Sequence, residues 1–173
     1  SSFSVTVSAL DAGNAVTTGY LGTIHFTSTD AAATLPSDYT FTAADAGVHT
    51  FTGLVLRTAG PRSVTATDTV LASVTGTASV SVTAAAAASL AVAAPANATA
   101  GTSFSATVTA LDAYGNVATG YLRTVHFTST DANATLPADS TLTSGSGNFN
   151  LTFQYSGTQT VTGTDTVTSS ITG

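Results

Sequence analysis

The feature that most constrains the fold of this chain is an internal duplication. The stretch TIHFTSTDAAATLP begins at Thr23, and its near copy TVHFTSTDANATLP begins at Thr124. Residues Ser1–Thr42 match Thr102–Thr143 at 29 of 42 positions, and after a four-residue shortening Gly60–Gly76 match Gly157–Gly173 at 10 of 17. Helical solenoid repeats are commonly about 20–50 residues long. A repeat of about one hundred residues therefore predicts tandem whole domains.

Within each copy, apolar and small polar residues alternate, as they do in strands with one buried face. The pattern is clearest in FSVTVSAL (Phe3–Leu10) and its copy FSATVTAL (Phe104–Leu111). Turn signals such as DAGN, TLPSD and TAGPR separate the alternating runs. Thr, Ser, Ala, Val and Gly dominate, while Lys and Glu, which usually cover exposed helices, are absent. The chain is predicted to be all-β, with antiparallel β-sandwiches whose outer faces carry hydroxyl groups.

The expected organisation is one domain over residues 1–83, an Ala-rich connector over 84–88 and a second domain over 89–173. The segment Thr77–Gly101 occurs only once, between the two copies. The first copy is therefore expected to lack its first strand, and the second copy its last. Two explanations remain open: the chain is a stretch of a longer array, or its open sheet edges pair with neighbours in an assembly.

The repeated text resembles a known family. The D-x-x-G-N turn of DAYGN, followed by GYLRTVHFTST and by GTQTVTGTDTV, is similar to bacterial immunoglobulin-like repeats of large surface and secreted proteins, including invasin and intimin arrays and filamin-type domains. The resemblance implies two tandem immunoglobulin-like sandwiches and no catalytic residue. The first copy departs from it at DAGNAV and at FTGLVLRTAG, where one additional residue predicts a bulge or a longer hairpin.

Charge and composition exclude several functions. The net charge is −6 and only three Arg carry positive charge, so nucleic acid is not an expected partner. The Ala-rich run at 84–96 is too short to cross a bilayer, which excludes membrane insertion through it. There is no Cys, Met or Lys, which leaves little for oxidants or trypsin-like proteases to attack. These traits predict an extracellular or cell-surface location.

Recurring polar residues are the candidate site residues. His25 and His126 alternate with apolar neighbours, so each is expected on the outer face in a cross-strand contact, and His49 has no counterpart. Calcium sites need several converging oxygens, but the Asp residues stand singly, so they are expected to cap turns. The recurring carboxylates are Asp11, Asp30, Asp38 and Asp68, with partners Asp112, Asp131, Asp139 and Asp165. Calcium at the domain junction remains an alternative, and no other cofactor is expected.

Two further sets of residues are candidates for attachment of, or contact with, sugars. Asn97, Asn133 and Asn150 lie in N-x-T sequons and are weak candidates for glycan attachment. Tyr20 and Tyr121 either stack on a sugar or bury their rings and bond backbone groups. No nucleophile stands beside a base and no G-x-S-x-G motif occurs, so the chain is not expected to be an enzyme.

The predicted function is that of a structural repeat: a spacer, a stalk or a self-assembling fibre unit of an extracellular bacterial protein. The expected partners are neighbouring copies of the same repeat. An adhesive module that binds glycan or a host surface is the main alternative, and an accessory domain of an enzyme is a third. An adhesive module should carry an exposed aromatic or Asp cluster that differs between the copies.

Overall fold

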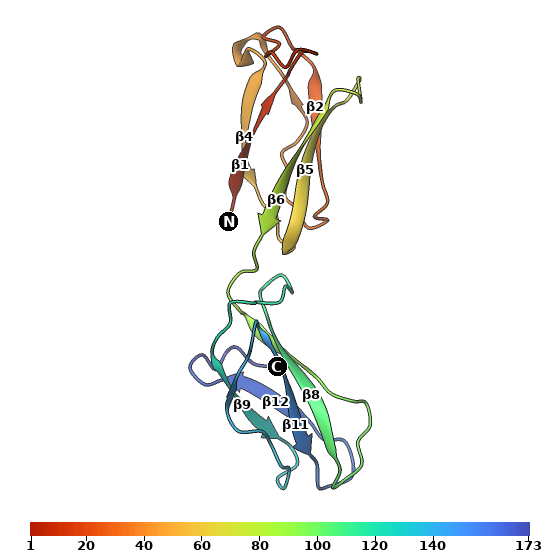
Figure 1. Ribbon diagram of the computed structural model, residues 1–173, viewed down its shortest axis with the longest axis vertical. Coiled ribbons are helices and arrows are strands. Elements are labelled where there is room, and N and C mark those ends of the chain that lie inside the picture. The colour runs from red at the N-terminus through yellow and green to blue at the C-terminus, as the bar shows by residue number, and fades with distance from the viewer. The chain divides into compact units, whose positions relative to one another are not determined.

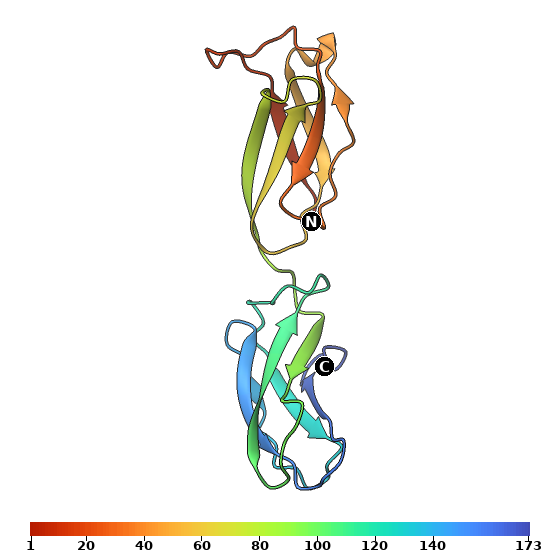
Figure 2. The ribbon, with the colours of Figure 1, turned by 90° about the vertical axis from the view of Figure 1, so that its right-hand side faces the viewer.

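The computed structural model describes all residues, 1–173, as an all-β chain (Figure 1). The only helical element is the 3₁₀ turn η1 at Ala43–Asp45. The chain divides into two compact units, Ser1–Thr83 and Ala84–Gly173, and each is described by itself. Within each unit, two antiparallel sheets face one another in an immunoglobulin-like β-sandwich (Figure 2). The predicted all-β antiparallel fold is confirmed.

The first unit has a two-stranded and a four-stranded sheet. In the small sheet, β1 (Phe3–Ser8) pairs with β4 (Val48–Leu54). The larger sheet has the order β3-β2-β5-β6. Its strands are β3 (Tyr39–Thr40), β2 (Thr23–Ser28), β5 (Gly60–Asp68) and β6 (Thr75–Val82).

The second unit has two three-stranded sheets, in the orders β11-β8-β7 and β10-β9-β12. The first contains β11 (Ser146–Thr152), β8 (Ser103–Leu111) and β7 (Ser89–Ala93). The second contains β10 (Ser140–Thr141), β9 (Thr124–Ser129) and β12 (Val161–Asp165). An isolated bridge from Thr172 to Thr164 adds a short piece of chain beside β12. The strand β7 therefore has no counterpart in the first unit. The counterpart of β6 in the second unit is much shorter and consists of this bridge alone.

The alternation of buried and exposed side chains along the strands determines which residues form the cores. In β2, Ile24 and Phe26 are buried while His25 between them is exposed, and β9 repeats this order. In the first unit these side chains meet Phe51 and Leu54 from the opposite sheet. Burying a large apolar side chain contributes about 1.5–3 kcal/mol, so the facing inner surfaces are the main source of stability.

The outer faces carry paired threonines. Thr65 and Thr67 of β5 lie opposite Thr77 and Thr75 of β6, with hydroxyl oxygens 2.8 and 2.9 Å apart. Thr6 and Thr50 make the same contact at 2.9 Å across β1 and β4. Each hydroxyl can donate to one partner and accept from another, so such pairs satisfy one another without charge. The predicted hydroxyl-covered faces are confirmed.

The four-residue difference between the copies has two separate origins. Three of the residues form η1, which precedes a tight turn at Ala46 and Gly47 with positive φ angles of 46° and 79°. The second unit makes the same turn with Ser144 and Gly145 but has no η1. The fourth is Gly53, where the β1–β4 register shifts, whereas β8 and β11 pair without interruption. The bulge predicted in FTGLVLRTAG is confirmed.

The Ala-rich residues 84–88 form no helix and no strand. They are held by hydrogen bonds to the second unit, with the Ala88 N–H donating to the Leu111 carbonyl at 2.7 Å and the Ala85 N–H donating to Asp112 Oδ2 at 2.9 Å. The connector residues accordingly belong to the second compact unit.

Candidate functional site

The buried carboxylates join loops that are distant in sequence. Asp30 Oδ2 accepts the backbone N–H groups of Arg57 and Thr58, and Oδ1 accepts the Thr58 hydroxyl and the Ala32 N–H. Asp131 repeats this arrangement in the second unit with the N–H groups of Gln154, Tyr155 and Asn133. The loop after β2 is thereby tied to the chain after β4, and the loop after β9 to the chain after β11.

The electrostatics of Asp30 follow from these bonds. Burial alone raises the pKa of this carboxyl, because an apolar environment disfavours charge. The hydrogen bonds from Thr58, Arg57 and Ala32 outweigh burial and hold the pKa well below its usual range. Asp30 is therefore an ionised anchor, satisfied by the fold itself.

The turn-capping prediction holds for most of the recurring Asp residues. Asp11 Oδ1 accepts the N–H groups of Gly13 and Ala15, and Asp112 Oδ1 accepts those of Tyr114 and Asn116. The turn DAGNAV differs in sequence from its copy but has the same backbone conformation, because Asn14 adopts the positive φ angle that Gly115 has in the second copy. Asp38 and Asp139 are the exceptions, since their carboxylates contact histidines.

Each unit contains one tyrosine–carboxylate pair. The Tyr121 hydroxyl donates to Asp165 Oδ2 at 2.7 Å, and Tyr20 does the same to Asp68. Burial, reinforced by the neighbouring carboxylate, raises the pKa of Tyr20 to about 12. Both rings pack against the cores, as the second of the two expectations for these tyrosines states, and neither stands free to stack on a sugar. The expected backbone acceptor is wrong, because each hydroxyl donates to a carboxylate.

The repeated histidines lie on the outer faces, as predicted. His25 Nδ1 is 2.6 Å from Asp38 Oδ1, and His126 Nδ1 is 2.7 Å from Asp139 Oδ1. All four side chains are more than half exposed. Ion pairs at such positions contribute about 0–1 kcal/mol. No three His, Asp, Glu or Cys side chains gather into a cluster that could hold a metal ion.

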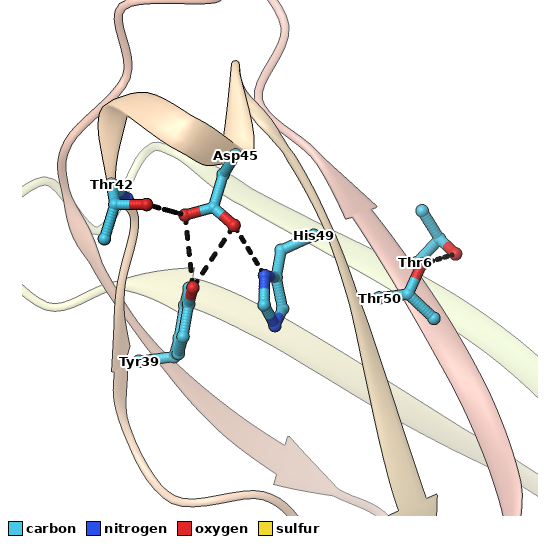
Figure 3. Close-up of polar contacts among 6 residues, drawn as sticks. All are labelled: Thr6, Tyr39, Thr42, Asp45, His49 and Thr50. Carbon is cyan, nitrogen blue, oxygen red and sulfur yellow. Dashed lines mark hydrogen bonds and ion pairs between the residues drawn. The ribbon is translucent and has the colours of Figure 1, made fainter.

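One polar cluster occurs only in the first unit (Figure 3). Around Asp45, the Thr42 N–H and hydroxyl donate at 2.7 Å, the Tyr39 hydroxyl donates at 3.1 Å, and His49 Nδ1 lies at 2.6 Å. The Tyr39 and His49 rings stack with centroids 4.1 Å apart. Hydrogen bonds from Thr42, with that of His49, hold the pKa of Asp45 below its usual range.

The second unit has no equivalent of this cluster. Ser140 stands where Tyr39 does, Gly147 stands where His49 does, and the η1 residues are missing. Sequence reasoning gave His49 little weight because it has no counterpart in the second copy. The signal that was available is Thr42-x-x-Asp45, the spacing at which a carboxylate reaches back to the first N–H of a helical turn.

The three sequon asparagines are exposed. Asn97 lies between β7 and β8, and Asn150 lies on β11. Asn133 follows β9, and its side-chain N–H donates to the Tyr155 hydroxyl at 2.7 Å. Glycan attachment at these positions stays a prediction.

The first unit has a groove of about 510 Å³ along the unpaired edge of β1. It is lined on one side by Val5 and Val7 of β1 and by Ala9, which follows this strand. The other side is lined by Thr75, Gly76 and Ala78 of β6, and the floor by Ala66 and Phe26. In the second unit the corresponding edge of β8 is covered by β7. As a result Ala106 and Val108 are buried, whereas Val5 and Val7 are only half-buried.

No protein-family model and no curated protein matches the sequence. Among solved structures, beta-glucuronidase 3 of Bacteroides uniformis is 12% identical with a TM-score of 0.43, covering 85% of this chain and 20% of its own. A glycosyl hydrolase family 2 member of Bacteroides cellulosilyticus DSM 14838 is 15% identical with a TM-score of 0.44, covering 95% and 27%. The D0-D1 domain of intimin is 17% identical with a TM-score of 0.38, covering 97% and 84%.

The chain thus spans about a fifth to a quarter of the two glycoside hydrolases. At these identities the likeness concerns the fold alone. None of the helical structure in the chain is long or apolar enough to cross a bilayer.

Proposed function

We propose that the chain is a structural repeat segment of an extracellular bacterial surface protein or filament. In this role residues 1–83 and 89–173 are two immunoglobulin-like domains that extend or space other parts, and 84–88 connect them. The partners are neighbouring copies of the repeat. The proposal includes neither catalysis nor nucleic acid binding.

The observation that carries the proposal is the repeated use of ionised Asp residues as loop anchors. Asp30 and Asp131 have exposed fractions of 3% each, and both carboxylate oxygens of each accept hydrogen bonds from loop groups. Asp68 and Asp165 bind the tyrosines and the N–H groups of the turn that follows each strand. Carboxylates used in this way hold the loops at both ends of each sandwich in place. Loops fixed in this manner suit a domain that bears mechanical load and has no catalytic role.

Single-molecule pulling of the whole chain tests this role. Two independently folded spacers should give two unfolding events, each releasing about 30 nm, since an extended residue spans about 3.3–3.6 Å. Asp30→Asn should lower the unfolding force of one event and leave the other unchanged. Asp38→Asn, at an exposed position, is the matched control and should change neither. Smooth extension without unfolding events contradicts a load-bearing role.

The adhesive alternative is supported by one observation: the Tyr39–His49 stack occurs only in the first unit, where the Tyr39 ring of the stack also packs against the core. Aromatic faces are used to bind apolar faces of ligands. A glycan array probed with the whole chain should then show saturable binding that His49→Ala abolishes and Tyr155→Ala leaves intact. Absence of binding, or equal binding by both variants, contradicts this alternative.

A further inference from the structure

We propose that the groove between β1 and β6 of the first unit is an acceptor for a β-strand with the sequence of residues 87–94, supplied by a neighbouring copy of the repeat. The inference deepens the proposed structural role and rests on it for the source of the strand. The occupant is specified by the second unit, which shows how such a strand is held.

In the second unit, β7 fills the equivalent position. Leu90 lies opposite Ala110 and Val92 opposite Val108 of β8, in antiparallel register. The Leu90 side chain is buried in the core, with 4% of its surface exposed. The Leu90 N–H also donates to the Thr172 carbonyl at 3.1 Å, beside β12. One strand thus closes the gap between the two sheets.

The acceptor strand β1 offers nearly the same surface as β8. The eight residues Phe3–Leu10 differ from Phe104–Leu111 only at Val5, which replaces Ala106, and Ser8, which replaces Thr109. Ala9 and Val7 are identical to Ala110 and Val108, so a bound strand would place its Leu over Ala9 and its Val over Val7. Antiparallel pairing of this kind supplies main-chain hydrogen bonds, and alternate side chains give specificity.

The opposite wall of the groove, formed by β6, also matches the corresponding chain segment of the second unit. A Cβ at Gly173 would lie 1.7 Å from the Leu90 carbonyl oxygen, so this position requires glycine when β7 is present. The equivalent residue of the first unit is also glycine, Gly76, where a Cβ would have no atom within 4 Å. Gly76 therefore keeps the space that the carbonyl of a bound strand would occupy.

The floor of the groove leaves room for the Leu and Val side chains of the bound strand. A Cβ at Gly163 would lie 3.5 Å from Leu90 Cδ1 and 3.7 Å from Val92 Cγ2, which are ordinary van der Waals separations. Ala66, the counterpart of Gly163, carries this methyl group and lines the groove. The Ala66 methyl would therefore contact the bound Leu and Val without displacing them.

The direct experiment is titration of the whole chain with a synthetic peptide of residues 87–95, with a Lys added at each end for solubility. We expect saturable binding by calorimetry and slowed amide hydrogen exchange in β1, with β8 unchanged. The control peptide carries Leu90→Asp and Val92→Asp and should bind at least about tenfold more weakly, because burial of the two apolar side chains is lost. Absence of binding, or equal binding of both peptides, overturns the proposal.

Variants of the chain locate the site. Gly76→Val adds a β-branched side chain to a strand with open space around it, so the fold should persist while the bound carbonyl is excluded. It should weaken peptide binding at least about tenfold. Ser79→Val, at an exposed position of the same strand on the other face, should leave binding unchanged. Equal affinity of the two variants would place the peptide elsewhere and overturn the proposal.

A fused strand separates this inference from the proposed function. A second copy of residues 84–101 placed before Ser1 should fill the groove from within the chain, raise the melting temperature and abolish binding of the free peptide. Continued binding contradicts the acceptor site. The two unfolding events of the pulling experiment test the structural role and do not depend on this result.

Discussion

The Tyr121 hydroxyl donates a 2.7 Å hydrogen bond to Oδ2 of Asp165, and both side chains are buried in the second unit. Burial raises the pKa of Tyr121, and the hydrogen bond to this carboxylate raises it further. Burial also acts to raise the pKa of Asp165, but the hydrogen bonds that Asp165 accepts outweigh burial and lower this pKa. The first unit repeats the contact with Tyr20 and Asp68. This pair therefore belongs to the construction of both sandwiches.

Replacing Tyr121 by Phe should destabilise the second unit by about 1–3 kcal/mol, because a buried charged acceptor loses its donor. The measurement is the free energy of unfolding from urea titration. Tyr155→Phe removes an exposed hydroxyl that contacts Asn133, and it should change the free energy by less than about 0.5 kcal/mol. Equal losses for the two variants would show that the buried bond adds nothing.

Asp131→Asn should destabilise by about 2–3 kcal/mol. The amide cannot accept at both of its ends, so either the N–H groups of Gln154 and Tyr155 or that of Asn133 would lose their acceptor. Asp139→Asn changes an exposed partner of His126 and should have little effect. Thermal and urea unfolding of both variants give the comparison. A neutral Asp131→Asn would refute the anchoring role.

Acid should weaken the second unit in a defined window. Burial raises the pKa of Asp112, but bonds from the Asn116 side chain and from N–H groups including that of Ala85 outweigh burial and lower it to about 2, from 3.8. A carboxyl whose pKa is lowered in the folded state stabilises above its unfolded pKa, and this contribution is lost as the pH falls through the folded pKa. The free energy of unfolding should therefore fall between about pH 4 and pH 2.

The matched variant for this pH effect is Asp112→Asn, which removes the titrating group. Its unfolding free energy should fall less steeply over the same pH range, with the other anchored carboxylates accounting for the remaining slope. Identical slopes for the two proteins would contradict the role assigned to Asp112.

Gly53→Ala should destabilise the first unit by about 1 kcal/mol or more. Gly53 has a φ angle of 78°, and an added methyl group would have no atom within 4 Å. The expected loss therefore comes from backbone conformation alone. Gly19→Ala, which also has open space but no positive φ angle, is the control and should be close to neutral. Differential scanning calorimetry compares them, and a neutral Gly53→Ala would mean that the bulge relaxes.

Local pattern was enough to predict the strands and several contacts. The order Ile24–His25–Phe26 predicted which side chains are buried, because side chains alternate across a strand. The single additional residue in FTGLVLRTAG predicted the bulge at Gly53. The loop position of Asp11 and Asp112 predicted their bonds to N–H groups two residues on, since this contact is set by local geometry.

Contacts between distant segments could not be predicted in the same way. Tyr20 and Asp68 are 48 positions apart, and only the packing of two sheets brings them together. The Asp45 cluster depends on a 3₁₀ turn that alternation does not reveal. The groove beside β1 follows from a strand that only one copy possesses, but the match of Gly76 to Gly173 became visible only once β7 was placed.

The separation of the length difference into η1 and the Gly53 bulge has a consequence for how such repeats tolerate insertion. Three residues enter at a hairpin end and one enters as an unpaired residue, so Phe51 and Leu54 still face inward as Phe149 and Leu151 do in the other copy. Copies of the repeat can therefore drift in size at these two places while the interior stays in phase. These two places are therefore where added residues would be expected to disturb either sandwich least.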